Sequence, residues 1–186
     1  MDNKLVYITG NNTKFEVASH VFKETKILLS QKNLDTPEIQ SKSVEEVAMY
    51  SAIWASKELN EPVFVTDAGF CIEALNGFPG PFIKYTNEWL SAEDYINLMD
   101  GKSNRDVIIK DCLAYCKPNE KPIIFTGSFN GRLATTTGKK CGTSIEQIFI
   151  PEGFNRPISE IPDEEMIDYW SKGDILTKFK EYIIGN

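Results

Sequence analysis

The chain has 186 residues, 41% hydrophobic and 25% charged, a composition typical of an ordinary globular domain long enough to bury a core. Its 27 acidic residues outnumber 20 basic ones; the formal net charge of -7 argues against a broad nucleic-acid-binding or acidic-membrane surface. No basic, apolar leader precedes the first expected strand and no apolar run approaches a membrane span, so we expect a cytoplasmic protein without membrane partners.

The first expected strand, residues 4–8, runs into a small polar loop, Thr9-Gly-Asn-Asn-Thr-Lys14, that opens a helix. Free backbone N–H groups and the helix dipole point at such a loop, which predicts a site for a phosphate or another anion. The same residues are also typical of a turn and a helix N-cap, with Asn12 or Thr13 as the cap. Lys14 favours the anion, because a cation in the first helical turn opposes the dipole.

The next elements alternate between strand and helix. A short strand is expected over residues 26–29, and a helix begins at a capping box made by Ser43 and Glu46. Residues 62–66 predict a buried strand that ends at Asp67. Ligands of α/β sheets bind at the carboxyl ends of strands, so Asp67 is the best catalytic candidate by position, with an Asx-turn as the structural alternative.

The second half of the chain adds several strands. A turn cluster over residues 76–81 precedes a short helix over residues 91–99. Strands are expected over residues 106–116, 122–132 and 145–150, the first two forming a hairpin, followed by a helix from residue 164 that is interrupted near Gly173. Adjacent strands with flanking helices predict an α/β fold with a mixed sheet.

The cysteines and the one histidine restrict the chemistry. Cys71, Cys112, Cys116 and Cys141 lack the paired spacing of zinc ligands, and the middle two lie in an apolar segment where burial is expected. His20 falls on the first helix without a nucleophile motif, which argues against a Ser-His-Asp triad. Hydrolytic chemistry would then rest on carboxylates, lysines and a hard cation bound through oxygen.

Five motifs follow one another in a characteristic order: Thr9-Gly-Asn-Asn-Thr-Lys14, Pro37-Glu-Ile-Gln40, Val65-Thr-Asp-Ala-Gly69, Asn76-Gly-Phe-Pro-Gly-Pro-Phe-Ile-Lys84 and Ile148-Phe-Ile-Pro-Glu-Gly-Phe154. Together they resemble the inosine triphosphate pyrophosphatase family, also called Ham1-like or non-canonical purine nucleoside triphosphate pyrophosphatases. The resemblance implies a single domain over residues 1–186 with a two-lobed fold, a long curved mixed β-sheet flanked by helices, a central cleft and a homodimeric state. It also implies a Mg²⁺-dependent hydrolase that converts a nucleoside triphosphate to the monophosphate and pyrophosphate.

Motif by motif, the resemblance assigns roles to residues of this chain. It implies that Asp67 and Lys14 are catalytic and that Glu38 and Asp67 bind the metal. Lys84 falls at the position of a substrate-binding lysine. The substrate-binding set that it implies is Thr9, Gly10, Asn11, Asn12, Thr13, Lys14, Ala68, Lys84, Glu146 and Lys172.

Two departures concern the phosphate half of the site. Ser51 stands where the family usually carries a phosphate-binding lysine, and Thr66 replaces the first member of an acidic pair. One cation and one carboxylate of the family pattern are therefore missing.

Other departures concern the base. Thr143 replaces a stacking aromatic residue, and Met166 and Ser171 replace a lysine and a histidine. Lys172 takes the place of an arginine, and Trp170 either stacks on a base or faces the core. The sequence thus leaves open an active pyrophosphatase with altered base selection, a nucleotide-binding homologue with weak or lost activity, and an unrelated α/β phosphatase or sugar-nucleotide enzyme.

Overall fold

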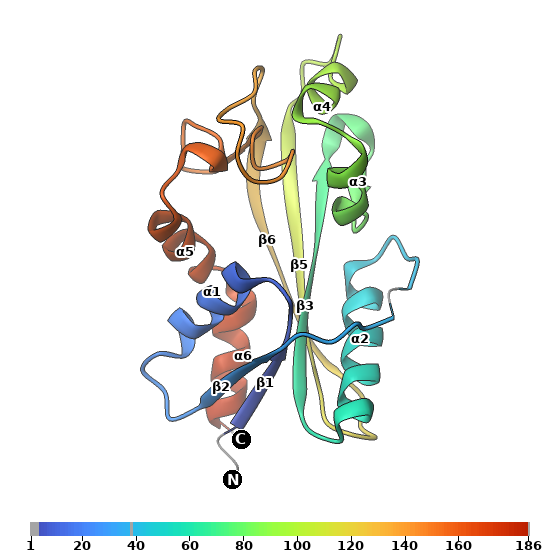
Figure 1. The fold of residues 1–186 in the computed structure, drawn as a ribbon, viewed down its shortest axis with the longest axis vertical. Coiled ribbons are helices and arrows are strands. Elements are labelled where there is room, and N and C mark those ends of the chain that lie inside the picture. The colour runs from blue at the N-terminus through green and yellow to red at the C-terminus, as the bar shows by residue number, and fades with distance from the viewer. Residues whose placement is uncertain (1–3, 38, 186) are drawn as a thin grey trace. The chain divides into compact units, whose positions relative to one another are not determined.

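The computed structural model of the chain describes residues 4–37 and 39–185, and Figure 1 shows their helices and strands. The packing of the chain divides it into two compact units. Unit 1 comprises residues 1–67, 111–127 and 167–186, and unit 2 comprises residues 68–110 and 128–166. The single domain expected over residues 1–186 stays a prediction.

The strands form one mixed β-sheet. In the described part of the chain its order is β2-β1-β3-β5-β6-β7, with β4 paired to β3 off this path. β1 is parallel to β2 and β3, whereas the pairs β3–β4 and β6–β7 are antiparallel. The expected α/β class with a mixed sheet is therefore confirmed. The strands are β1 Lys4–Ile8, β2 Leu28–Lys32, β3 Val63–Ile72, β4 Pro79–Gly80, β5 Asp106–Cys116, β6 Ile123–Leu133 and β7 Phe149–Pro151.

Helices occupy most of the segments between the strands. The α-helices are α1 Asn12–Phe22, α2 Val44–Leu59, α3 Ile83–Trp89, α4 Ala92–Leu98, α5 Asp163–Ser171 and α6 Asp174–Gly185. Among the described residues, no helix is long and apolar enough to cross a membrane.

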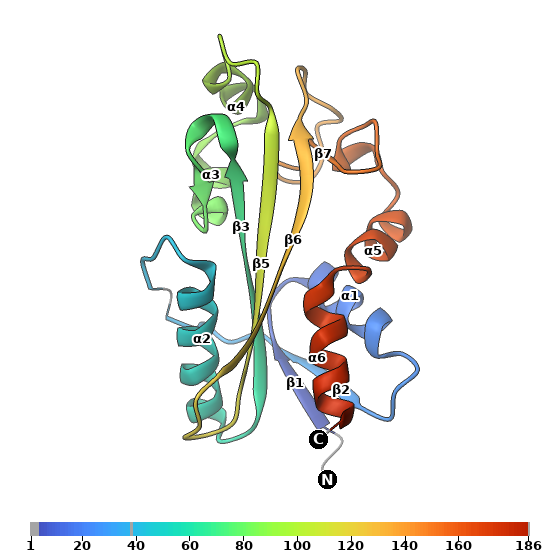
Figure 2. The ribbon, with the colours of Figure 1, turned by 180° about the vertical axis from the view of Figure 1, so that it is seen from behind.

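Unit 1 buries apolar side chains on both faces of its strands. Along β1, Leu5 and Tyr7 belong to one cluster, and Val6 and Ile8 belong to another. Because successive side chains of a strand point to opposite faces, a strand that is covered on both sides is apolar throughout. Helices α1 and α6 cover the first face and α2 covers the second, as Figures 1 and 2 show from opposite sides.

In unit 2, strand β7 lies close against β6. A Cβ atom at Gly131 would collide with the ring of Phe149 and the carbonyl oxygen of Ile150, so the close approach of the two strands requires glycine there. The Phe149 ring in turn packs edge-on against Phe70 of β3, with the ring centroids 5.2 Å apart. These contacts tie β3, β6 and β7 together within the interior of unit 2.

Several expected elements match and others do not. β1 and β5 have the expected bounds, the hairpin between β5 and β6 is present, and the last helix is interrupted at Gly173 as expected. The strand expected over residues 26–29 is present but lies later in the chain, at Leu28–Lys32, because the side chain of Thr25 accepts from Ile27 N and forms a turn before β2. The strand expected over residues 145–150 is present only as the shorter β7, Phe149–Pro151, so its expected start is wrong. Helix α3 was not expected.

The capping box expected for α2 is half correct. The Ser43 side chain accepts from Glu46 N, as expected for an N-cap. The second bond of a capping box, from Ser43 N to the Glu46 side chain, is not formed. Ser43 N donates to Ser41 Oγ instead, and the Ser41 hydroxyl group donates to the Glu46 carboxylate. A complete capping box instead begins α4, between Ser91 and Asp94.

Candidate functional site

The loop between β1 and α1 is built around Asn11. This residue is the N-cap of α1, where its side chain accepts from Lys14 N at 3.1 Å, so the expectation that Asn12 or Thr13 is the cap is wrong. Asn11 N donates to Thr9 Oγ1 at 3.1 Å. The first turn of α1 has no acidic side chain, so the positive end of the helix dipole and the charge of Lys14 lie together.

The side chain of Lys14 connects this loop to β3. Its Nζ atom donates to the carbonyl oxygen of Thr66 at 3.4 Å, at the peptide bond that leads into Asp67. The Thr66 hydroxyl group forms a hydrogen bond of 2.5 Å with the Tyr7 hydroxyl group, and burial raises the pKa of Tyr7. The structure thus brings together Lys14 and the backbone that leads into Asp67.

Asp67 lies inside β3 and not at its end, which corrects its expected position. The strand continues to Ile72 because Phe70 and Cys71 pair with β4. β3 pairs with β1 only at its start, through Val63 and Phe64. Continuing the register of this β1–β3 pairing along β3 places Asp67 level with the loop that follows β1. The strand whose carboxyl end lies at the candidate site is therefore β1 and not β3.

Asp111 is a carboxylate near this site that the sequence analysis did not identify. It lies in β5, which is adjacent to β3 in the sheet. Burial raises the pKa of Asp111 to about 6, the positive charge of Lys14 acts to lower it, and the negative charge of Asp67 acts to raise it. The one available signal was an acidic residue in the middle of a largely apolar strand, which is more often a sign of a solvent-facing position.

The neighbouring Cys112 is buried. Its thiol pKa is raised to about 12 by burial and by the negative charges of Glu45, Asp67 and Asp111. A thiol that stays protonated is a poor nucleophile and a poor metal ligand. This agrees with the expectation of a packing role for Cys112 and Cys116, both of which are buried and free.

A metal would be held through oxygen. Glu38 lies outside the described residues, and among the residues that are described no group of three or more His, Cys, Asp or Glu side chains could hold a metal ion. Mg²⁺ is commonly bound by one or two carboxylates together with substrate phosphates and water. Asp67, next to the peptide that Lys14 contacts, fits a cation that is shared with a substrate better than a closed structural metal site.

Unit 2 holds the predicted residues Ala68, Lys84 and Glu146. Lys84 lies in the first turn of α3, with Nζ 5.7 Å from the centroid of the Tyr85 ring. The Glu146 carboxylate accepts from Thr143 N at 2.6 Å, and Glu146 N donates to Thr143 Oγ1 at 3.3 Å. Glu146 therefore closes its own turn, an interaction that the sequence analysis did not anticipate.

The turn over residues 143–146 is also attached to α3 and the residue after it. Ile145 N donates to Asn87 Oδ1 at 3.3 Å, and Ser144 Oγ donates to the carbonyl oxygen of Leu90 at 2.5 Å. These bonds fix the orientation of the turn relative to the helix that carries Lys84.

Near the end of α5, Lys172 and Trp170 lie in unit 1. The Lys172 ammonium group pairs with Asp168 at 2.6 Å, both side chains being exposed. Trp170 packs against the cluster formed by α1, α6 and the strands, which favours the core-facing alternative.

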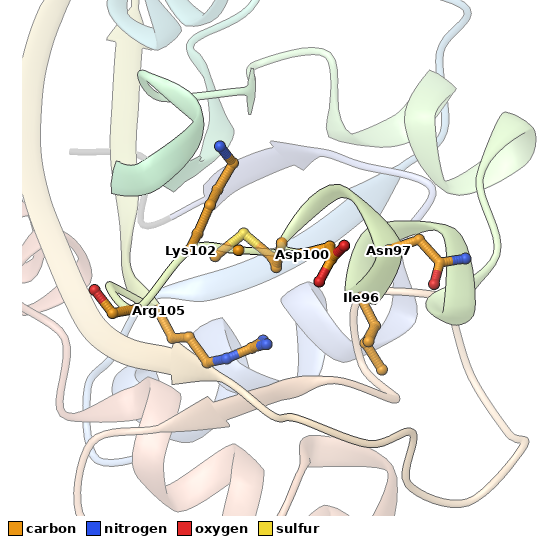
Figure 3. A pocket seen from close by; sticks show the side chains of 8 residues that line it. Ile96, Asn97, Asp100, Lys102 and Arg105 are labelled. Carbon is orange, nitrogen blue, oxygen red and sulfur yellow. The ribbon is translucent and has the colours of Figure 1, made fainter.

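Two pockets lie in unit 2, and no predicted site residue lines either of them. The first has a volume of about 590 Å³. Figure 3 shows Ile96, Asn97 and Asp100 lining it from α4 and the following turn, and Lys102 and Arg105 from the segment that leads into β5. The second, of about 420 Å³, shares Arg105 with the first.

Solved structures share this α/β fold. A Ham1 protein from Coxiella burnetii superposes with a TM-score of 0.74 at 20% identity, covering 90% of this chain and 96% of that chain. The Ham1 protein of Staphylococcus aureus superposes with a TM-score of 0.69 at 22% identity, covering 87% and 88%. The architecture is therefore that of Ham1 proteins. The model of the Ham1 family matches residues 5–182, and the chain belongs to that family.

Curated relatives cover nearly all of the chain. It is 36% identical over 183 residues to a dITP/XTP pyrophosphatase of Methanopyrus kandleri, which covers 98% of this chain and 97% of the relative. A dITP/XTP pyrophosphatase of Thermococcus kodakarensis is 33% identical, covering 98% of both chains. Inosine triphosphate pyrophosphatase 1 of Trypanosoma cruzi is 31% identical, covering 88% of this chain and 84% of the relative.

Proposed function

We propose that this protein is a pyrophosphatase that hydrolyses non-canonical purine nucleoside triphosphates, of the inosine and xanthosine type, to the monophosphate and pyrophosphate. Near full-length relatives named dITP/XTP pyrophosphatase support the reaction class. Within this chain the proposal is carried by one observation. The Lys14 ammonium group, at the N-terminus of α1, is bonded to the peptide that leads into Asp67.

The loop and Lys14 would bind the polyphosphate. Unpaired N–H groups at a helix N-terminus and a lysine ammonium group stabilise phosphate charge, and more so as charge develops on the leaving pyrophosphate. Asp67 would accept the proton of the water that attacks the α-phosphorus, while the bond between that phosphorus and the bridging oxygen breaks. The products are a nucleoside monophosphate and pyrophosphate, so atoms and charge balance.

The finer parts of the proposal concern the metal and the assembly. Glu38 and Asp67 would hold Mg²⁺ together with phosphate oxygens. When bound, the ion neutralises phosphate charge and polarises the phosphoryl group. The homodimeric state and the cytoplasmic location belong to the proposal too, with the family resemblance as support for the first.

The proposed substrate contacts divide into those with the phosphate groups and those with the base. We propose that residues 9–14 and Lys84 bind phosphate groups, with Ala68 beside Asp67. Glu146 and Lys172 would lie on the base side. Because Glu146 is bonded to Thr143 N and Lys172 to Asp168, each would have to contact the base while retaining or exchanging a bond that already exists.

Pyrophosphate release in the presence of Mg²⁺ tests the proposal. Wild-type protein, Asp67→Asn and the control Asp106→Asn, an exposed residue at the start of β5, are compared on dITP, XTP, ITP, dUTP and the ordinary triphosphates. We expect turnover of dITP, XTP and ITP that Asp67→Asn lowers by ~10²-fold or more and Asp106→Asn leaves unchanged. Tight triphosphate binding by the wild type without pyrophosphate release would contradict it.

A further inference from the structure

We propose that Asp111 is a positioning residue for the phosphate site, whose negative charge holds the Lys14 ammonium group against β3 beside the phosphate-binding loop. The inference deepens the proposed function and rests on it. It assigns Asp111 a role through Lys14, without contact between Asp111 and the substrate.

The alternation of side chains along β5 places Asp111 on the same face as Lys14. Leu113 and Tyr115 belong to the cluster beneath α1 and α6, and Asp111 follows the same two-residue period. Tyr7 belongs to that cluster as well, and its hydroxyl group interacts electrostatically with Asp111. Helix α1, which carries Lys14, covers this face.

The opposite face carries Asp67 by the same rule. Val63 and Val65 belong to the cluster beneath α2, and Asp67 continues that period along β3. The two acids therefore approach the site from different faces of the sheet. Asp111 cannot be regarded as a duplicate of Asp67, and a separate role has to account for it.

Lys14 is the cation that acts on Asp111. Its positive charge favours the ionised carboxylate, whereas the charge of Asp67 opposes it. The lysine side chain has four methylene groups joined by rotatable bonds, so it loses considerable conformational entropy when its ammonium group is fixed. A single hydrogen bond of 3.4 Å to the Thr66 carbonyl oxygen restrains the ammonium group weakly, and the charge of Asp111 adds a second restraint from the adjacent strand.

A carboxylate near a polyphosphate site would by itself weaken binding through repulsion. The sign of its effect therefore depends on Lys14. With Lys14 present, loss of the Asp111 charge frees the ammonium group and weakens binding. With Lys14 removed, only repulsion is left, so loss of the same charge leaves binding unchanged or strengthens it.

A double-mutant cycle read by calorimetric binding of inorganic pyrophosphate tests this. The proteins are wild type, Asp111→Asn, Lys14→Met, the double variant and the control Asp106→Asn, each checked for folding by circular dichroism. We expect Asp111→Asn to weaken binding about 5-fold in the wild-type background and not at all in the Lys14→Met background. Asp111→Glu, which keeps the charge, should restore at least half of the lost binding free energy. Asp111→Ser, which removes the charge, takes the place of the asparagine variant should that variant not fold.

Equal weakening in both backgrounds, or tighter binding by Asp111→Asn with Lys14 present, would overturn the inference. In turnover, the expected change is a rise in KM larger than the fall in kcat. The two proposals fail separately. Suppose that the wild type binds pyrophosphate and that Asp111→Asn weakens this binding only when Lys14 is present, but that no triphosphate is hydrolysed to pyrophosphate. The proposed function then fails and the role of Asp111 stands.

Discussion

Asp111 carries a charge in a place where charge is costly. Its pKa is raised to about 6 chiefly by burial, and the strand around it packs against apolar side chains. An acid whose pKa is higher in the folded state than in the unfolded chain binds more protons when folded, so stability falls as the pH rises between the two pKa values. The stability that burial of this acidic group costs is consistent with a functional reason for the residue.

The stability of Asp111→Asn should depend on pH differently from that of the wild type. Between about pH 4 and pH 6 the wild type loses the free energy needed to ionise the buried carboxyl group, and the variant does not. We expect the free energy of unfolding of the variant, relative to that of the wild type, to increase by ~1–3 kcal/mol when the pH is raised from 4 to 8. Urea unfolding at intervals across this range measures the difference, and a difference that is constant with pH would contradict the prediction.

At the scale of single residues, the sequence indicated Lys14 and Asp67 but not Asp111. A lysine in the first turn of a helix and an acid after a buried strand can each be recognised from local pattern. Asp111 becomes visible only when β1, β3 and β5 are placed side by side, because its neighbours come from residues more than forty positions away in the chain, Tyr7 and Lys14 among them. Local pattern carries no information about such partners.

Among the elements, the start of α1 is both a capped helix end and the anion site that we propose. Asn11 satisfies Lys14 N, and the same turn presents the N–H groups proposed to bind phosphate. The two roles of Asn11 are expected to separate on substitution. A cap needs only an acceptor oxygen, whereas an anion site is also sensitive to charge.

Asn11→Ala should lower the free energy of unfolding by ~1 kcal/mol, since the cap is lost. Asn11→Asp keeps an acceptor and should retain stability, but its negative charge should weaken pyrophosphate binding several-fold. Ser91→Ala, which removes the cap of α4 in unit 2, is the matched control: it should cost similar stability without changing pyrophosphate binding. Unaltered binding by Asn11→Asp would argue against an anion at this loop.

Helix α3 shows why some elements could not be predicted. Its residues follow a cluster of glycine and proline, its N-cap residue Phe82 makes no side-chain capping bond, and it has only seven residues. The extension of β3 past Asp67 was missed for a related reason, since its partner β4 has two residues and lies within that same cluster. Tertiary pairing, which a local pattern does not contain, decided both.

At the scale of the whole molecule, the predicted site residues are distributed over both units. Lys14 and Asp67 lie in unit 1, and the turn over residues 143–146 lies with Lys84 in unit 2. The sequence predicted the α/β class from the alternation of strands and helices. It could not predict the division, because the unit boundaries fall inside β3, β5, β6 and α5, where no linker or change of composition marks them.

Selection of the base should respond to changes at the turn over residues 143–146, which carries Glu146, while the phosphate-binding loop of unit 1 stays intact. Asn87→Ala removes the acceptor that holds Ile145 N and loosens the turn against α3. We expect the ratio of kcat/KM for dITP to that for dGTP to fall ~3- to 10-fold, as for the loss of one positioning hydrogen bond, while pyrophosphate affinity stays within twofold. Asn97→Ala, an exposed residue of α4, is the control. A parallel loss of pyrophosphate affinity would contradict this division of roles.

The absence of a side chain at Gly131 has an evolutionary consequence. Any larger residue there must displace the Phe149 ring of β7, and that ring packs against Phe70 of β3, three strands away in the sheet order. The displacement caused by one added methyl group would therefore be transmitted through the interior of unit 2. Among random variants selected for foldability, position 131 should stay fixed as glycine while its exposed strand neighbour Arg132 drifts freely.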